Sequence, residues 1–342
     1  YKIHTYTQEG RLFEGKTPAS AFLNSSYDGS FIAGLMELRY IQSLPVERII
    51  NYFESHGFTL KKPTAHKLIE KASSLFENLY KCIRQTALSD PYKAADETYY
   101  KILVPEKNSK GKGVRKGYLW VVVGINTRMI YLLYDDGSRS ERVILNELGS
   151  CKGIIQSDGY SPYRKLESDA YPNITRIPCL QHIKRKFIDC GEKDPDAKRI
   201  VELINALYQN EHKHKVGVEG WTVEQNLMHR KKYAPDILGE IKDVLDEIEE
   251  RGDLLPKSEL QEAITYLRNE WNAVVDIFNY GDTYLDNNMV ERMNRYISLS
   301  RKNSLFFGSH KGAERGAILY TIALTCRMHK VNLFEYLTDV IN

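Results

Sequence analysis

The chain has few cysteines, and their arrangement gives little indication of a disulfide framework or a metal site. Five occur among 342 residues, and none lies in a Cys-x-x-Cys pair. An odd number without paired spacing indicates reduced, mostly buried thiols of a cytosolic protein. Long apolar runs are also missing, since none reaches the roughly 18 residues that a membrane-spanning helix needs. No signal peptide is recognisable, so we expect no membrane partner.

An excess of charge of one sign is missing as well. The formal net charge is +3, from 48 basic and 45 acidic residues, which indicates nucleic-acid binding only weakly. Clustering of the basic residues would matter more than their sum. Hydrophobic residues make up 42% and charged residues 27%, as in ordinary globular proteins. The length allows about two or three domains, and because the chain begins at Tyr1 we expect a segment upstream of it.

The first part of the chain is predicted to be an arm followed by helices. Residues 1–29 show little periodicity and are assigned to an N-terminal arm, whereas residues 30–90 have a helical pattern. Pro45 suits a first helical turn, Gly57 a C-terminal cap, and a second helix is expected near Pro63. Two short helices joined in this way form either a DNA-binding helix-turn-helix or a plain helical bundle.

The next part, residues 91–190, is predicted to be built around a sheet. Five segments rich in β-branched and aromatic residues are expected to be strands, at 99–104, 118–123, 129–134, 153–157 and 174–180. The first three are too close together for intervening helices and should form an antiparallel meander, whereas short helices at 141–148 and 163–166 flank the fourth. The expected fold is therefore α/β, a mixed five-stranded sheet with flanking helices.

The remaining sequence is predicted to be helical. Apolar residues recur at helical spacing through residues 191–284, which we assign to an all-helical insertion. Residues 285–342 are again helical, interrupted by a polar and aromatic loop at 301–312, and are expected to complete the core.

Three carboxylates are the strongest candidates for chemistry. Asp96 is expected at the start of the first strand, Asp158 at the end of the fourth, and Glu291 in the first turn of a late helix. Acids placed in this way can converge at one sheet edge, where three carboxylates suit two Mg²⁺ ions that clamp the attacking and leaving oxygens of a phosphodiester. The alternatives are a loop end, an Asp-Gly turn, and a helix cap in which Glu291 pairs with Asn288 and Arg295.

A second cluster follows the fifth strand and combines Cys179 and His182 with three cations. A zinc site would require a second, suitably spaced pair of ligands, and the sequence offers none, so we predict no zinc here. A histidine and cations at the start of a helix can instead face phosphates, although a solvated helix face has the same pattern. The candidate DNA contacts of this cluster are His182, Lys184, Arg185 and Lys186.

Two further basic segments are candidate DNA-binding surfaces. The loop at 106–117 has five basic residues in twelve and joins two strands, so it is either a grip on the DNA backbone or a solvated loop. Near the C-terminus, cations alternate with Phe306 and Phe307, which suits phosphate contact and base stacking or, alternatively, packing between helices. The candidate DNA contacts there are Arg292, Asn294, Arg295, Arg301, Lys302 and Asn303.

Five motifs in order resemble the transposases of the insertion-sequence 66 family. They are ADET at 95–98, QSDGYSPY at 156–163, CLQHIKRKF at 179–187, LDNNMVERMNR at 285–295 and RKNSLFFGSHKGAER at 301–315. The resemblance extends from about residue 30 to the C-terminus. Two departures stand out: Ala95 occupies a position where the family often has histidine, and the family's typical N-terminal zinc-binding segment is not part of this sequence.

The resemblance implies a ribonuclease H-like catalytic core in which Asp96, Asp158 and Glu291 bind Mg²⁺ or Mn²⁺, with two ions expected. It further implies cleavage at transposon ends and strand transfer into target DNA. The expected partners are double-stranded DNA, further copies of the chain and accessory proteins of the same element, in the bacterial cytoplasm at the nucleoid. The alternatives are a catalytically inactive or repurposed DNA-binding protein, and a ribonuclease H-like nuclease without strand transfer.

Overall fold

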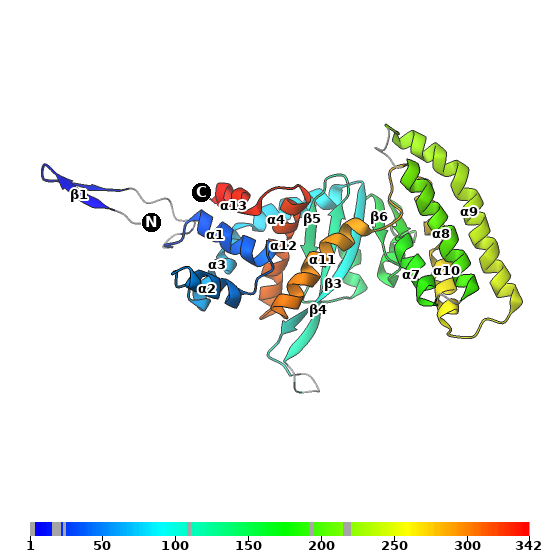
Figure 1. The fold of residues 1–342 in the computed structure, drawn as a ribbon, viewed down its shortest axis with the longest axis horizontal. Coiled ribbons are helices and arrows are strands. Elements are labelled where there is room, and N and C mark those ends of the chain that lie inside the picture. Colours follow the sequence, from blue (N-terminus) through cyan, green and yellow to red (C-terminus); the bar gives the residue numbers. More distant parts are fainter. Residues whose placement is uncertain are drawn as a thin grey trace.

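A five-stranded mixed sheet lies at the centre of an elongated molecule, between an N-terminal hairpin at one end and a group of three helices at the other (Figure 1). The structure is a computed structural model. It describes residues 4–15, 22, 25–107, 111, 113–191, 194–214 and 220–341.

The sheet has the strand order β5-β4-β3-β6-β7. Neighbouring strands from β3 to β5 are antiparallel, whereas β6 runs parallel to both β3 and β7. The strands span Tyr92–Leu103 (β3), Val114–Gly124 (β4), Ile130–Leu133 (β5), Gly153–Ser157 (β6) and Ile174–Pro178 (β7). The predicted antiparallel meander and the mixed five-stranded sheet are therefore confirmed.

The first strand begins earlier than the sequence predicts, and this changes the position of Asp96. We expected Asp96 at the start of a strand at 99–104, but β3 begins at Tyr92 and Asp96 lies near its middle, opposite Val121 of β4. Residues 92–95 are buried although Lys93 and two alanines have low strand propensity, because β4 and β6 pair with this segment on both sides.

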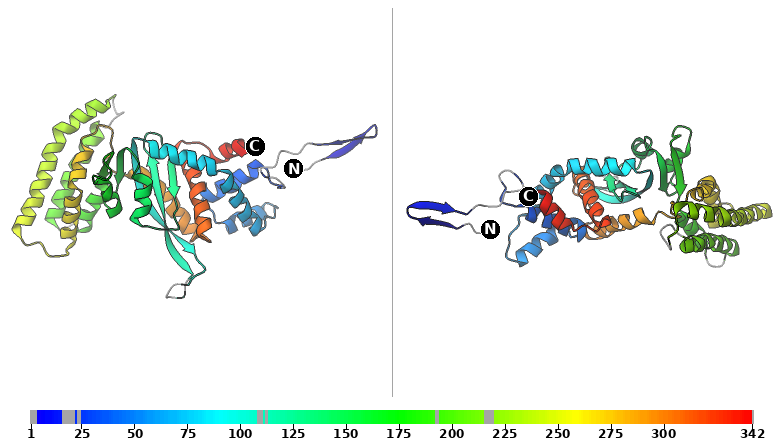
Figure 2. Two further views of the ribbon diagram at one scale, coloured as in Figure 1. Left: turned by 180° about the vertical axis from the view of Figure 1, so that it is seen from behind. Right: turned by 90° about the horizontal axis from the view of Figure 1, so that it is seen from above.

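Helices cover the sheet and its β5 edge. Figure 2 shows α4 (Glu77–Ser89) and α11 (Asn288–Ser304) on opposite sides of the strands. Helix α12 (His310–Met328) runs along β5, where the hydroxyls of Thr321 and Thr325 accept hydrogen bonds from Leu132 N and Ile130 N. These contacts satisfy backbone groups that an edge strand would otherwise leave open.

The remaining helices fall into a connecting set, an N-terminal set and a C-terminal helix. The connecting helices are α5 (Glu141–Leu148), α6 (Ser161–Arg164), η2 (Lys165–Glu167) and α7 (Leu180–Asp189), and the N-terminal ones are α1 (Gly29–Met36), η1 (Glu37–Ile41), α2 (Val46–Ser55) and α3 (Lys62–Leu75). Helix α13 (Leu333–Ile341) packs against α1, so the first and the last helix of the described chain meet. Helices α2 and α3 are separated by residues 56–61, and a helix-turn-helix role for them stays a prediction.

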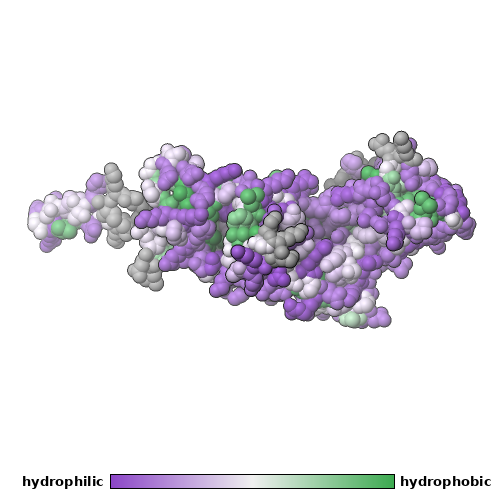
Figure 3. Space-filling model, turned by 90° about the horizontal axis from the view of Figure 1, so that it is seen from below, coloured by the Kyte–Doolittle hydropathy of each residue, from purple (hydrophilic) through white to green (hydrophobic). Residues whose placement is uncertain are grey.

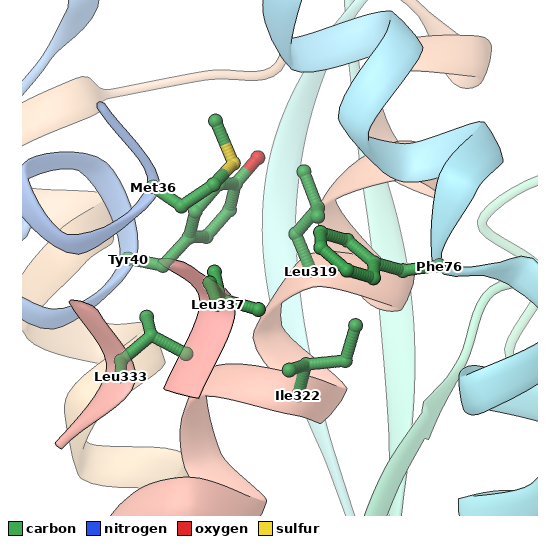
Figure 4. A pocket seen from close by; sticks show the side chains of 7 residues that line it. All are labelled: Met36, Tyr40, Phe76, Leu319, Ile322, Leu333 and Leu337. Atoms are coloured by element: carbon green, nitrogen blue, oxygen red, sulfur yellow. The ribbon is translucent and has the colours of Figure 1, made fainter. Parts of the chain in front are cut away.

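Figure 4 shows where the N-terminal and C-terminal helices meet, around a cavity of about 10 Å³. Apolar side chains surround it, so the space is expected to stay dry. The lining residues are Met36, Tyr40, Phe76, Leu319, Ile322, Leu333 and Leu337.

The N-terminal arm contains a hairpin that we did not predict. Strands β1 (Thr5–Gln8) and β2 (Arg11–Glu14) pair around Glu9 and Gly10, both of which have positive φ. Two positive-φ residues in a two-residue loop match the twist of a hairpin. The Glu9-Gly10 pair, between two segments that mix polar and apolar residues, could therefore have indicated this turn.

The predicted helical region after the sheet forms a three-helix unit: α8 (Pro195–His214), α9 (Val223–Arg251) and α10 (Glu259–Ile277) (Figure 1). Its inner surface is anchored by Arg230, which is buried and paired with Glu211 at 2.6 Å. Helix α10 contacts both β7 and α7, so the unit is attached to the edge of the sheet that lies nearest Asp158.

The expected loop at 301–312 is shorter than predicted, because α11 continues to Ser304 and α12 begins at His310. Phe306 is exposed, whereas Phe307 is buried against Tyr100, with ring centres 4.2 Å apart, and pairs with β3 at Ile102. One of the two phenylalanines therefore belongs to the core.

The surface is mostly polar. Figure 3 shows apolar residues as small separate patches on one face. None of the helices that the structure describes combines the length and the hydropathy of a membrane-spanning segment.

Candidate metal centre

Asp96 lies on the central strand, held by groups from two directions. One of its oxygens accepts a hydrogen bond from Glu97 N at 2.8 Å, and the other accepts one from the amide of Asn294 on α11. Asn287, just before α11, donates to the carbonyl oxygen of Ala95 at 3.0 Å. The helix that carries Glu291 is therefore attached to β3 on both sides of that glutamate.

Asp158 follows β6 directly, and its position is set through the main chain. Arg176 of β7 donates to the carbonyl oxygen of Asp158 at 2.7 Å and to the hydroxyl of Ser157 at 3.0 Å. The Asp158 carboxylate accepts a hydrogen bond from Tyr160 N at 3.1 Å. Because the guanidinium of Arg176 has no exposed surface, these contacts are shielded from water.

The guanidinium of Arg176 is itself held by two carboxylates. Glu270 of α10 lies 2.6 Å away and Glu167 of η2 lies 2.5 Å away. Burial raises the pKa of Glu270, although the neighbouring guanidinium opposes this rise. A cation, two anions and a main-chain carbonyl thus connect the three-helix unit to the end of β6.

A second contact from α10 reaches the same loop. Tyr266 accepts a hydrogen bond from Gly159 N at 2.8 Å. A Cβ at position 159 would lie 2.5 Å from the Tyr266 hydroxyl oxygen, so only glycine allows this approach. The Asp-Gly sequence therefore marks a close backbone approach at the candidate centre.

Asp96 is buried and lies near the negative charges of Glu97 and Asp158. Burial, together with the charges of Glu97 and Asp158, raises the pKa of Asp96 to about 8. The charge of Glu97 is partly offset by Arg139, whose Nε lies 3.0 Å from its carboxylate, although burial raises the pKa of Glu97 as well. A site with this much clustered negative charge suits a divalent cation with oxygen ligands.

Glu291 lies one turn into α11 and contacts different residues. Its carboxylate lies 3.9 Å from the Cys179 sulfur and 3.7 Å from Nδ1 of His182. Cys179 caps α7 and His182 lies in its first turn, so β7 and α7 bring both to the same end of the sheet. Among the described residues, the set of three metal-ligating side chains that lie within 4.8 Å of one another is Cys179, His182 and Glu291.

The sequence-predicted acids are therefore brought to one end of the sheet in two groups. Asp96 and Asp158 interact through their charges, and Asn294, on the turn of α11 after Glu291, contacts Asp96 directly. The carboxylate of Glu291 points toward Cys179 and His182 instead of completing a cluster of three acids within 4.8 Å. All three acids have the oxygen donors that Mg²⁺ or Mn²⁺ requires.

The basic residues predicted on α7 lie just beyond this centre. The ammonium of Lys184 is 5.8 Å from the centre of the Tyr208 ring, and that of Lys186 is 5.7 Å from the centre of the Tyr266 ring. Arg185 is exposed. The tyrosines come from α8 and α10, so these cations line the junction between α7 and the three-helix unit.

The residues predicted on α11 differ in exposure. Arg292, Arg295 and Lys302 are exposed, whereas Asn294 is buried against Asp96. The side chain of Asn294 therefore serves the candidate centre directly, a use that its position among cations in the sequence did not indicate.

Two other predicted contacts are engaged with the protein. Arg301 stacks on Tyr99, with its guanidinium carbon 3.8 Å from the ring centre, and donates to the hydroxyl of Thr98 at 3.2 Å. Asn303 donates to the carbonyl oxygen of Ser43 at 3.2 Å. The basic loop at 106–117 lies partly outside the described residues.

Several residues of the centre were not singled out by the sequence. Tyr266 and Glu270 lie one helical turn apart on α10, which is a spacing typical of any buried helix face. This pattern does not indicate that α10 contacts the loop after β6, which lies more than a hundred positions earlier in the chain. The isolated Arg176 does not indicate a contact with that loop either. The residues missed in this way are Glu97, Arg176, Tyr266, Glu270 and Asn287.

The comparison with protein families identifies the class. A model of the IS66 family of transposases matches residues 24–315. The chain therefore belongs to the IS66 transposase family, as the ordered motifs indicated.

Curated relatives are similar along most of the chain. An uncharacterized protein of Sinorhizobium fredii, y4jD, is 25% identical over 97% of this chain and 66% of its own length. A second one, y4hP, is 24% identical over 87% of this chain and 56% of its own length. The chain thus spans between about half and two thirds of these relatives.

Proposed function

We propose that the chain is a DNA transposase that cleaves transposon ends and transfers the strands to target DNA, with Asp96, Asp158 and Glu291 as its metal-binding residues. The observation that carries this proposal is the acidic pair Asp96 and Asp158 at one end of the sheet, where burial, followed by the charges of Glu97 and Asp158, raises the pKa of Asp96 to about 8. In a transposase of the IS66 family, such a pair is best explained as a cation site.

The proposed core is ribonuclease H-like. A three-stranded antiparallel meander followed by two parallel strands, in the order β5-β4-β3-β6-β7, supports this fold. The three-helix unit is then an insertion between α7 and α11, within the predicted insertion at 191–284. Its contacts with Arg176 and Gly159 give it a role in positioning Asp158.

Each group of the centre has a defined part in this proposal. Two Mg²⁺ or Mn²⁺ ions, when bound, would stabilise the attacking and leaving oxygens of the phosphodiester. Asn294 orients the Asp96 carboxylate, and Arg176 fixes the carbonyl of Asp158. Water attacks at the transposon end and frees a 3′-hydroxyl, which then attacks target DNA.

Basic and polar side chains around the centre are proposed to hold double-stranded DNA. Phosphate contacts of this kind position the duplex without reading its sequence. Joining two transposon ends calls for more than one copy of the chain, so an oligomer on DNA is part of the proposal, as are accessory proteins of the same element and a bacterial, nucleoid-associated location. The proposed contacts are His182, Lys184, Arg185, Lys186, Arg292, Arg295, Arg301, Lys302 and Asn303, with Asn294 inside the centre.

The test is an Asp158→Asn variant, assayed for cleavage of the ends of its own element with Mg²⁺ or Mn²⁺. Cleavage should fall by at least about a thousandfold while DNA binding is retained. Asp169→Asn, which changes an exposed acid beyond η2, is the matched control and should cleave normally. Normal cleavage by Asp158→Asn would overturn the proposed mechanism.

A strand-transfer assay with pre-cut ends separates the alternatives. Joined product is expected for a transposase, whereas a nuclease of the same fold would cleave and give none. An inactive DNA-binding protein would bind the ends but neither cleave nor join them.

A further inference from the structure

Three side chains of different chemistry meet at the start of α7. Cys179 precedes the helix, His182 lies in its first turn, and Glu291 reaches them from α11. The Cys179 sulfur and the His182 Nδ1 lie 3.9 Å and 3.7 Å from the same oxygen of Glu291. A thiol, an imidazole and a carboxylate are together the ligand types of a zinc site.

The spacing of these atoms fits a tetrahedral ion. With ordinary zinc–ligand bond lengths, a sulfur and an oxygen at two corners of a tetrahedron would be about 3.6 Å apart, and a nitrogen and an oxygen about 3.4 Å apart. The observed separations of 3.9 Å and 3.7 Å are each longer by a few tenths of an ångström. The sulfur and the nitrogen lie within 4.8 Å of each other, so side-chain rotations that shorten these separations would bring the three atoms to one ion.

The surroundings of the two softer ligands favour a metal-bound state. Burial raises the pKa of the Cys179 thiol to about 12, so the free chain keeps the thiol protonated, whereas the hydrogen bond from Asn287 N at 3.2 Å and the N-terminus of α7 favour the thiolate that a bound metal ion would hold. Among the described residues, the buried Nδ1 of His182 has no hydrogen-bond partner. Buried ring nitrogens normally have a hydrogen-bond or metal partner, and a cation between Nδ1 of His182 and Glu291 would supply one.

We propose that Cys179, His182 and Glu291 form a second metal site, selective for Zn²⁺ and similar borderline-soft ions, which takes Glu291 away from Asp96 and Asp158. The thiol proton of Cys179 is released to solvent on binding, and the fourth position is left to water. Thiolate and imidazole select against Mg²⁺. The consequence for catalysis rests on the proposed function: a Zn²⁺-loaded chain cannot cleave, because Glu291 is withdrawn from the acids on the strands.

The direct test is a Co²⁺ titration of the full chain, followed by absorption. Tetrahedral Co²⁺ bound to a thiolate gives a sulfur-to-metal charge-transfer band in the near ultraviolet and intense visible bands. We expect both in the natural chain and in Asp158→Asn, and neither in Cys179→Ser. Cys190→Ser, which changes a cysteine at the other end of α7, is the matched control and should keep both bands.

A second variant guards against loss of fold in Cys179→Ser. His182→Gln should keep the thiolate band but bind Co²⁺ about tenfold or more weakly. Circular dichroism shows whether each variant is folded. A charge-transfer band that persists unchanged in folded Cys179→Ser, or Co²⁺ affinity unchanged in folded His182→Gln, would overturn the site.

Cleavage assays then separate this inference from the proposed function. With Mg²⁺ present, added Zn²⁺ should inhibit cleavage by the natural chain at a concentration about tenfold lower than that needed for His182→Gln. A Cys179-dependent Co²⁺ site in a chain without Mg²⁺-dependent cleavage would refute the transposase proposal and leave the metal site standing. Cleavage without such a Co²⁺ site would refute the metal site alone.

Discussion

Asp158 and Glu291 are both partly exposed carboxylates at one end of the sheet, but they are held in different ways. Asp158 is fixed through its main chain, since Arg176 binds its carbonyl and Tyr266 binds the next amide. Glu291 lies on a helix that Asn287 and Asn294 attach to β3, while the polar contacts of its own side chain with described residues are longer, at 3.9 Å and 3.7 Å. The position of Asp158 is thus set by main-chain contacts, whereas the position of the Glu291 carboxylate depends on the rotamer of its side chain.

This difference explains how one centre can be both rigid and adjustable. The main chain at Asp158 is held in one position, because any other position would leave the buried guanidinium of Arg176 without one of its hydrogen-bond acceptors, and an unpaired buried charge costs free energy. The side chain of Glu291 can instead change rotamer without disturbing its helix, as the proposed exchange between the two metal sites requires. The predictions below test the fixed half of this comparison, beginning with the largest expected effect.

Arg176→Met should destabilise the protein most. The substitution removes the buried guanidinium and leaves Glu270, whose side chain has no exposed surface, with only the more distant Arg164, 3.9 Å away, as a cationic partner among the described residues. Breaking a buried pair in this way costs about 3–5 kcal/mol of unfolding free energy. Urea denaturation measures the loss, and cleavage should fall as well, because the carbonyl of Asp158 loses its donor.

Arg199→Met is the matched control for this prediction. Arg199 pairs with Glu247 at 2.7 Å, but both side chains are about half exposed, at 53% and 55%. Its loss should cost less than about 1 kcal/mol. Equal stability of the two variants would show that Asp158 is not held by a buried network, and Glu270→Gln gives a milder test if Arg176→Met does not fold.

Asp96→Asn should stabilise the metal-free protein at neutral pH. Burial raises the pKa of Asp96 to about 8 in the folded chain, against its ordinary value of 3.8. The folded state therefore binds more protons than the unfolded state between these values, and the natural chain loses stability as the pH rises from about 4 to 8. Asparagine has no such loss, so the gain at pH 7 is at most about 4 kcal/mol.

The measurement is the unfolding free energy of both proteins at pH 4 and pH 7. The gain should be large at pH 7 and small at pH 4, where Asp96 is protonated in the folded state and still partly protonated in the unfolded state. The new amide can pair with Asn294 once the Asn294 amide rotates, since its oxygen has no partner among the described residues. A gain that is the same at both pH values would contradict a raised pKa.

The sequence predicts the scaffold of this centre better than its contacts. The limits of β6, at 153–157, follow from a short apolar segment between turn residues, and the structure confirms them. The start of β3 was missed because residues 92–95 are held as a strand by their neighbours, not by their own propensity. The local sequence pattern therefore predicts the limits of strands that are rich in β-branched residues, whereas the limits of other strand segments depend on pairing with neighbouring strands.

Contacts between distant segments could not be predicted from the sequence for a different reason. Spacing along the chain argued against zinc at Cys179 and His182, because a second nearby pair of ligands was missing. The third ligand-type side chain, Glu291, comes from a helix 112 positions after Cys179. Local periodicity places each residue on its element, but it cannot show which elements meet.

Tyr266→Phe should have the smallest effect of the three, and it tests whether the three-helix unit positions Asp158. The variant loses only the hydroxyl that accepts the hydrogen bond from Gly159 N. One such bond contributes about 1 kcal/mol, and if all of it is felt at Asp158 the cleavage rate falls about fivefold. Single-turnover cleavage of pre-bound DNA measures this change, because the observed rate constant then does not depend on how fast DNA binds.

Tyr280→Phe controls for the loss of a tyrosine hydroxyl at the same junction. Tyr280 follows α10 and lies 3.4 Å from the Thr175 hydroxyl, so it touches β7 but not the loop after β6. Its cleavage rate should be unchanged. If Tyr266→Phe also cleaves at the natural rate, Arg176 alone fixes Asp158, and the hydrogen bond from the insertion to the loop contributes to stability without affecting the chemistry.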